Sequence, residues 1–283
     1  MISFDGLLRS ILTQCDTRTF PKGEGEKDSV PFLVKRSVEF IQQFTQIEGL
    51  FRISASHSTL QDVKSQIDTS DDFGASAIDL LTVTAHEAQR QHTETPPASA
   101  SAESEPTSTS TSTSTLRYHT TAVVVAHLLC GLLKQFLREL ERPLLLVEMF
   151  EEWMIVLDAS EQESRNQSQD QDQDQGQDRA QQSVGVTKAV INRLPEEHRR
   201  VLCAVLGLSW QLSREKHRTF NKMTTSNMAT VVGPNLIRPP DSLLTPESFG
   251  RINSLAEFLI ESFPVLFPVQ DPDRSCLGLS FDA

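Results

Sequence analysis

The sequence lacks clustered cysteines and long apolar segments, and these absences exclude several classes of protein. Four cysteines are spread over 283 residues and no two are spaced as C-x-x-C: Cys15, Cys130, Cys203 and Cys276. We therefore expect reduced thiols, as in a cytoplasmic protein, and neither a disulfide framework nor a zinc site. No apolar run is long enough to cross a bilayer, and the N-terminus has no basic region followed by an apolar stretch. We therefore expect neither a membrane span nor a secretory signal.

Basic side chains are also scarce relative to acidic ones. The chain carries 26 Lys and Arg against 38 Asp and Glu, a formal net charge of −12. Nucleic acid is therefore not expected as the main partner, because phosphate binding needs a basic face. A local basic site remains compatible with this composition.

Patterns typical of hydrolases, metal sites and nucleotide-binding loops are missing as well. His86 and His92 are six residues apart, whereas a zinc-protease helix places its two histidines four apart on one face. The glycines at 23 and 25 do not have the spacing of a phosphate-binding loop. The sequence thus predicts no metal and no cofactor.

Alternation typical of β-strands is nearly absent, whereas apolar residues recur at helical spacing over most of the chain. We expect helices over about 31–48, 58–67, 124–140, 149–157, 195–212, 224–232 and 249–263. Thr224 should cap the sixth helix and Gly233-Pro234 should end it. The predicted fold class is all-α, a helical bundle with additional peripheral helices.

Two low-complexity segments do not fit a packed core. Residues 71–117 contain a Ser/Thr alternation, and residues 159–184 contain a Gln/Asp alternation. Neither segment can bury enough apolar surface to offset the entropy of ordering, so we expect both to be mobile. We interpret them as loop insertions in one domain spanning 1–272, followed by a tail at 273–283. Separation of two or three small domains is the alternative, but the flanking pieces look too short to fold alone.

Three stretches carry candidate functional residues. The first, EGLFRISAS at 48–56, places Arg52 in a short loop after a glycine that should end a helix. A loop position leaves the side chain free to reach outward. Taken alone, Arg52 would be interpreted as a solvated surface arginine, which is the usual fate of this residue type.

The second stretch, LLKQFLRELERPL at 132–144, places Lys134 and Arg138 four residues apart on one helix face. Two like charges there repel mildly, which favours a use beyond helix stability, although simple solvation would also explain them. The third stretch, NKMTTSNMATVVGPNL at 221–236, places Asn235 after the Gly-Pro pair. Asn235 should project from the turn, or simply close it.

Together and in this order, the three stretches closely resemble the motifs of the RhoGAP family, whose members stimulate GTP hydrolysis by Rho-type small GTPases. The Leu194-Pro195 start of a long helix matches as well, and residues 3–8 match weakly. Two positions depart from the family pattern. Glu141 stands where proline is usual, which suggests a looser turn, and Ala55 replaces a glycine of the loop.

The resemblance implies a RhoGAP-type helical bundle and assigns roles to four residues. Arg52 corresponds to the arginine finger, which is inserted into the partner's site to stabilise the transition state. Lys134 and Arg138 correspond to a basic pair that docks the GTPase and supports the finger loop, and Asn235 to a residue that contacts the GTPase. The chain itself would be an activator and not an enzyme acting on its own.

The implied partner is a GTP-bound small GTPase of the Rho or Rac type. We expect a monomer in the cytoplasm, which the GTPase can bring to membranes. The alternative is a catalytically weak RhoGAP-like module that binds a GTPase as a scaffold or effector. Members of that type often lack the finger arginine, and Arg52 is present here.

Overall fold

The computed structural model describes residues 30–55, 57, 60, 61, 63, 65, 111–167, 183–271 and 281. Within these ranges there is no strand, and the all-α prediction is confirmed. The helices are α2 (Phe32–Gln43), α5 (Thr111–Glu139), η1 (Val147–Met149), α6 (Phe150–Gln167), α8 (Glu196–Ser213), α9 (Glu215–Asn221), α10 (Thr225–Leu236), η2 (Asp241–Leu243), α11 (Pro246–Glu261) and α12 (Phe263–Leu266). Residues 183–191 are also helical.

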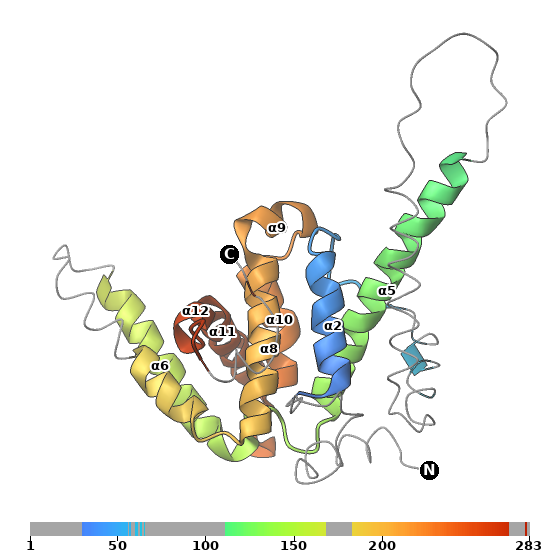
Figure 1. The fold of residues 1–283 in the computed structure, drawn as a ribbon. Coiled ribbons are helices and arrows are strands. Elements are labelled where there is room, and N and C mark those ends of the chain that lie inside the picture. Colours follow the sequence, from blue (N-terminus) through green and yellow to red (C-terminus); the bar gives the residue numbers. More distant parts are fainter. Residues whose placement is uncertain are drawn as a thin grey trace, which may run out of the picture.

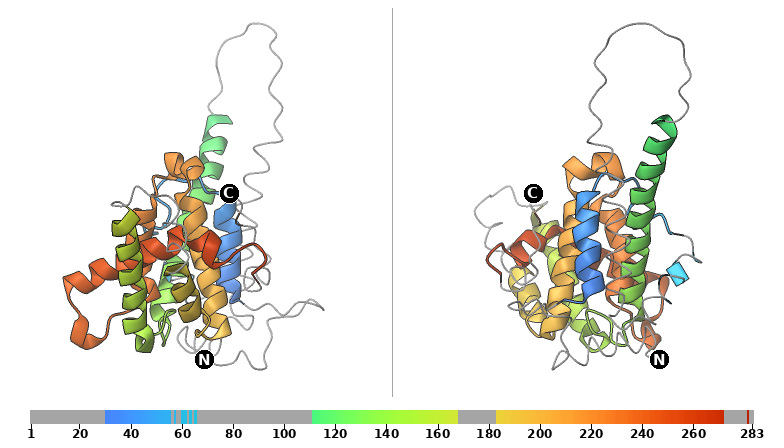
Figure 2. Two further views of the ribbon diagram at one scale, coloured as in Figure 1. Left: turned by 90° about the vertical axis from the view of Figure 1, so that its left-hand side faces the viewer. Right: turned by 45° about the vertical axis from the view of Figure 1, so that its right-hand side comes forward.

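Four helices, α2, α5, α8 and α10, run side by side and form the bundle (Figure 1). α8 packs against α2, α10 and α11, and most of its surface is buried. α11 packs on α10 and α6, so that α6 lies on the far side of the molecule from α5 (Figures 1 and 2). α9 sits at one end of the bundle, beside the loop that follows α2.

One continuous apolar core holds these helices together, and its burial is the main favourable term in folding. Its largest fully buried side chains include Trp153, Phe40, Phe136 and Phe263. Trp153 carries a polar N–H into the core, and this group donates to the carbonyl of Leu145 at 2.7 Å. The buried indole therefore has a partner, which removes the penalty for an unpaired donor.

α10 begins as predicted but ends later than predicted. The Thr224 hydroxyl accepts from the backbone N–H of Asn227 at 3.2 Å, which confirms Thr224 as the cap. The helix then continues through Gly233 and Pro234 to Leu236, so the predicted end was wrong. Pro234 lies in the last turn of α10 and has no backbone N–H to donate. The carbonyl that consequently lacks a helical donor is that of Thr230, four residues earlier, and Thr230 is exposed.

Gly233 serves close packing instead of ending the helix. A Cβ atom at this position would lie 3.1 Å from the Cβ of Ala256 and 3.3 Å from the carbonyl oxygen of Ile252. Both atoms belong to α11. The missing side chain lets α10 and α11 approach each other closely, which fixes α10 on the bundle.

Three further expectations need correction. α2 ends at Gln43, before the Gly49 that was expected to break it, because the chain turns at residues 44–50. The last predicted helix, at 249–263, is instead divided between two helices, because α11 ends before Ser262 and Pro264 lies in the first turn of α12. Val124 and Phe249 begin two of the ranges that were predicted from recurring apolar residues, but they do not belong to the core, since their exposed fractions are 51% and 42%.

The helices extend into the edges of both predicted insertions. α5 begins at Thr111, inside the predicted 71–117 segment, and α6 continues to Gln167, inside the predicted 159–184 segment. Side chains with high helix propensity are not needed there, because each helix is already nucleated by its buried part. The middle of each insertion and most of the predicted tail at 273–283 lie outside the described residues. The division into one domain with two insertions stays a prediction.

The described residues cover only part of the chain to which the remaining sequence expectations refer. Cys130 and Cys203 are buried and are not linked in a disulfide within the described part of the chain. Cys15 and Cys276 lie outside the described residues, as do His86, His92 and the glycines at 23 and 25. In the described part of the chain, no group of His, Cys, Asp and Glu could hold a metal ion. None of the helices described is both long enough and apolar enough to cross a membrane.

Two helical glycines offer a test of the packing. A Cβ atom at Gly207 of α8 would lie 2.8–2.9 Å from the rings of Phe263 and Phe281, whereas one at Gly250 of α11 would meet nothing within 4 Å. We expect Gly207→Ala to lower the free energy of unfolding by about 1–3 kcal/mol through overpacking. Gly250→Ala should raise it by up to about 1 kcal/mol through helix propensity. Urea denaturation of both variants measures the difference, and equal effects would contradict the packing at Gly207.

Candidate functional site

The loop that carries Arg52 is held in a tight turn by a glycine. In this Arg52 loop (residues 44–55), the Gly49 carbonyl accepts from the backbone N–H groups of Arg52 at 3.0 Å and Ile53 at 2.8 Å. Gly49 has φ +71°, and a Cβ there would lie 2.7 Å from the Ile53 side chain. Only glycine fits both the left-handed backbone and the close contact.

Two apolar side chains anchor the turn in the core. Leu50 and Phe51 precede Arg52 and are 0% and 2% exposed. Phe51 takes φ +66°, a conformation that side chains with a Cβ rarely adopt, so the turn stores local strain. With Phe51 directed inward, the next residue, Arg52, is exposed. Among the described residues, no group pairs with the Arg52 guanidinium.

A buried amide, Asn221, joins the Arg52 loop to the bundle. Its Nδ2 donates to the carbonyls of Thr45 at 2.9 Å and Leu212 at 3.0 Å, and its Oδ1 accepts from the N–H of Met223 at 2.8 Å. The backbone carbonyl of Asn221 also accepts from the N–H of Gly49 at 2.8 Å. One side chain with no exposed surface thus links the loop, α8 and Met223, which precedes α10.

The sequence pattern did not reveal this role of Asn221. The residue was noted only as the first letter of a motif, because a single asparagine near a helix end usually closes a local turn. Its partners lie 9 and 176 residues away in the chain. Such distant pairing has no local signal in the sequence.

Lys134 on α5 supports the loop from the other side. Its Nζ donates to the carbonyl of Phe51 at 2.5 Å, immediately before Arg52. Burial, and to a smaller extent the positive charge of Arg138, lowers the pKa of the Lys134 ammonium. One turn earlier, burial raises the pKa of the Cys130 thiol to about 12, so this thiol is neutral and unreactive.

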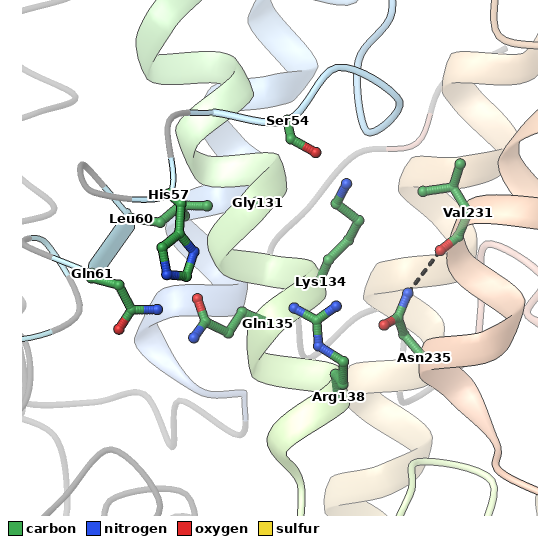
Figure 3. Close-up of a pocket in the computed structure, with 10 residues that line it drawn as sticks. All are labelled: Ser54, His57, Leu60, Gln61, Gly131, Lys134, Gln135, Arg138, Val231 and Asn235. Carbon is green, nitrogen blue, oxygen red and sulfur yellow. Dashed lines mark hydrogen bonds between the residues drawn. The ribbon is translucent and has the colours of Figure 1, made fainter.

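Lys134, Arg138 and Asn235 line one hollow of about 320 Å³ (Figure 3). α5 also contributes Gly131 and Gln135 to the wall, and α10 contributes Val231. The remaining lining residues follow the Arg52 loop or belong to it: Ser54, His57, Leu60 and Gln61. The two predicted basic residues and the predicted asparagine are therefore neighbours, although about 100 residues separate them in the chain.

Arg52 does not line this hollow but lies beside it. The bond from Lys134 to Phe51 joins the wall of the hollow directly to the backbone preceding Arg52. Asn235 lies in the last turn of α10 and not in a turn beyond the helix, which corrects the sequence prediction. Its Nδ2 donates to the Val231 carbonyl at 2.7 Å, which leaves its side-chain oxygen for another partner.

Arg238, which no sequence pattern pointed to, caps the C-terminal end of α5. The Arg238 guanidinium donates to the carbonyl of Arg138, and to that of Leu140 at 3.4 Å. A cation at a helix C-terminus satisfies the last carbonyls and the helix dipole. The turn after Leu140 is therefore held in place, although Glu141 replaces the proline that would have stiffened it.

Comparison with known proteins points to one family. Residues 103–241 match the family model of the RhoGAP domain. The matched stretch includes Lys134, Arg138 and Asn235 and begins after Arg52. Rho GTPase-activating protein 1 of Homo sapiens is 34% identical over 146 residues, which cover 52% of this chain and 28% of that protein.

One further relative and one solved structure extend the similarity over most of the chain. Rho GTPase-activating protein 68F of Drosophila melanogaster is 24% identical over 251 residues, which cover 88% of this chain and 39% of that protein. This chain thus spans well under half the length of these curated relatives. The crystal structure of human Rho GTPase activating protein 15 has the same fold, with a TM-score of 0.56 and 16% identity. That similarity covers 92% of this chain and 89% of the other.

Replacement of the buried amide tests how the loop is held. Asn221→Ala would leave two buried carbonyls and one N–H without partners, so we expect it to lower the free energy of unfolding by about 3 kcal/mol. Asn227→Ala is the matched control, because Asn227 is exposed and its side chain makes a single 3.2 Å bond to the Lys222 carbonyl. Chemical denaturation compares the two, and an equal loss would rule out the anchoring role of Asn221.

Proposed function

Because the chain belongs to the RhoGAP domain family, we propose that it activates a Rho-family GTPase by placing Arg52 in the partner's nucleotide site. The observation that carries this proposal is the contrast between the loop and its arginine. The loop backbone is bonded to α5 and to Asn221, whereas the Arg52 side chain is exposed and has no partner among the described residues. The backbone at Arg52 is thus held in place, whereas the guanidinium is free to contact another molecule.

Phosphoryl transfer explains why an arginine suits this task. As the bond to the γ-phosphate breaks, negative charge is spread over the phosphate oxygens and the leaving oxygen. A guanidinium stays charged and donates several hydrogen bonds in a fixed plane, which matches this charge distribution. An arginine supplied in trans is worth about 10³–10⁵ in rate. Because the γ-phosphate is the target, the proposed partner is the GTP-bound form, of the Rho or Rac type.

The rigid loop contributes to the proposed rate enhancement. Its turn is fixed by Gly49, its apolar side chains are buried, and its carbonyl at Phe51 is bonded to Lys134. Only the side chain of Arg52 then needs to be ordered when the GTPase binds. Positioning a catalytic group in advance removes much of the entropic cost from the reaction step.

The contacts around the hollow beside Arg52 support different roles for the other predicted site residues. We assign GTPase contact to Arg138, whose side chain is exposed and has no partner among the described residues, and to Asn235. We assign support of the loop to Lys134, whose ammonium is already bonded to Phe51. On this proposal the chain acts as a monomer in the cytoplasm and reaches membranes through the GTPase.

Removal of the Arg52 guanidinium should separate acceleration from binding. We expect Arg52→Ala to lose about 10³-fold or more of the acceleration of GTP hydrolysis. Affinity for the GTP-bound partner should change by less than about threefold, because the arginine acts mainly in the transition state. Arg52→Lys should also be poor, since lysine lacks the planar fork.

Single-turnover GTP hydrolysis with a panel of Rho and Rac-type GTPases measures these effects. Arg165→Ala is the control, because Arg165 is exposed on α6 and its one ion-pair partner within the described ranges is Glu161 of the same helix. A variant at position 52 that accelerates hydrolysis as well as the parent would end the proposal. A parent that binds a GTPase without accelerating hydrolysis would instead identify a binding module.

The two basic residues of α5 should differ in which kinetic constant they control. Arg138→Ala should raise the Kd for the GTPase by about tenfold, more at low salt, with the saturating hydrolysis rate unchanged. Lys134→Ala should lower the saturating rate as well, because the Phe51 carbonyl loses its partner and the loop loosens. Titration of each variant under single-turnover conditions separates the two constants. Identical profiles for both variants would contradict the assigned roles.

A further inference from the structure

The charge of α9 is opposite to that of the chain as a whole. Residues 214–222, which comprise α9 and one flanking residue on each side, carry four Lys or Arg and a single Glu, in a chain with a net charge of −12. The basic residues are Arg214, Lys216, Arg218 and Lys222, and all four are exposed. A short segment of a strongly acidic protein thus presents a compact basic surface.

Acidic residues gather elsewhere in the described part of the chain. α6 carries five Asp or Glu (Glu151, Glu152, Asp158, Glu161 and Glu163) against one arginine. α6 lies on the opposite side of the molecule from α2 and α5, whereas α9 sits at the end of the bundle beside the Arg52 loop (Figures 1 and 2). Three of these carboxylates are paired with arginines (Glu152 with Arg193, Asp158 with Arg251 and Glu161 with Arg165), so the clearest contrast is between the net charge of −12 and the four cations at α9.

The basic surface adjoins the Arg52 loop through a direct bond. Asn221, the last residue of α9, accepts from the N–H of Gly49 at 2.8 Å through its carbonyl. Arg52 lies three residues beyond that bond. A partner that takes up the Arg52 side chain must therefore approach the end of the molecule where α9 lies.

Several α9 side chains have no evident structural use. Arg214 stacks on the Trp210 ring, with its Cζ 4.7 Å from the ring centroid. Among the described residues, by contrast, the exposed side chains of Lys216 and Arg218 form no ion pair. Phe220 is 54% exposed although it is large and apolar. An exposed aromatic side chain among unpaired cations is typical of a surface that meets another molecule.

We propose that α9 is a steering surface that guides an acidic face of the GTPase onto the Arg52 loop. The proposal rests on the proposed function, since it names the partner surface that the same site receives. Charges at the rim of an interface change the association rate and its salt dependence more than they change the dissociation rate. A protein with a net charge of −12 would repel an acidic partner. The basic surface at α9 attracts such a partner and so directs its approach towards Arg52.

Charge reversal on α9 tests the steering role. The full chain with Lys216→Glu and Arg218→Glu should associate with a GTPase loaded with a non-hydrolysable GTP analogue about tenfold more slowly at roughly 50 mM salt. The difference should shrink to about twofold at roughly 500 mM salt, where charges are screened. The dissociation rate and the saturating hydrolysis rate should stay within about twofold of the parent. Stopped-flow fluorescence gives both rate constants.

A matched control changes the same total charge at a distance. Arg165→Glu and Arg193→Glu alter exposed arginines that are paired with Glu161 and Glu152 of α6. We expect this variant to associate within about twofold of the parent rate, because steering depends on where the charge lies. Equal slowing in both double variants would show that only net charge matters and would overturn the proposal. So would a slower saturating hydrolysis rate in the α9 variant with normal association.

Two further outcomes keep the proposal separate from the proposed function. If Arg52→Ala abolishes acceleration but the α9 variant associates normally, the function stands and the steering role falls. If the α9 variant binds the GTPase normally but loses binding to vesicles of equal phosphatidylserine and phosphatidylcholine, the surface serves a membrane and the proposal is wrong. A parent chain that binds no GTPase overturns both.

Discussion

The site depends on how the backbone around Arg52 is fixed. Three polar contacts from distant parts of the chain reach this loop: the Gly49 N–H donates to the Asn221 carbonyl, the Asn221 amide donates to the Thr45 carbonyl, and the Lys134 ammonium donates to the Phe51 carbonyl. Without them the loop would rely on two buried side chains alone, and one of these sits in a strained backbone conformation. The contacts come from α5 and α9, so the position of Arg52 is set by the packing of the whole bundle.

The same arrangement links stability to function. Asn221 satisfies carbonyls of the loop and of α8 with one buried amide, and a buried network of this kind favours a single geometry when every member is paired. The loop is therefore rigid where it meets the core and free only at the exposed guanidinium. A finger that acts on a transition state needs this combination, because its alignment must already exist before the partner binds.

Helical spacing and motif order predicted much of the fold and grouped three of the four site residues. Lys134 and Arg138 fall on one face of α5 because their spacing of four matches the helix repeat. The prediction failed at Gly233-Pro234, where tertiary packing against α11 lets the helix continue past a glycine and a proline. Local propensity is a weak guide when a neighbouring helix supplies the stabilising contacts.

Contacts between distant segments could not be predicted in this way. The partners of Asn221, the capping of α5 by Arg238 and the position of α9 beside the Arg52 loop all depend on how the helices are arranged. A sequence pattern gives the face on which a side chain lies but not what that face meets. The basic residues of α9 are evident in the sequence, but only the structure shows that α9 lies beside the Arg52 loop.

The most direct test of the account is binding to a transition-state mimic. A GTPase loaded with GDP and aluminium fluoride carries a planar group where the γ-phosphate transfers, so a finger that stabilises the transition state should favour this form. We expect the parent chain to bind it at least about 10²-fold more tightly than the GDP form, and Arg52→Ala to lose that preference. Equal affinity of the parent chain for both forms would contradict the central role given to Arg52.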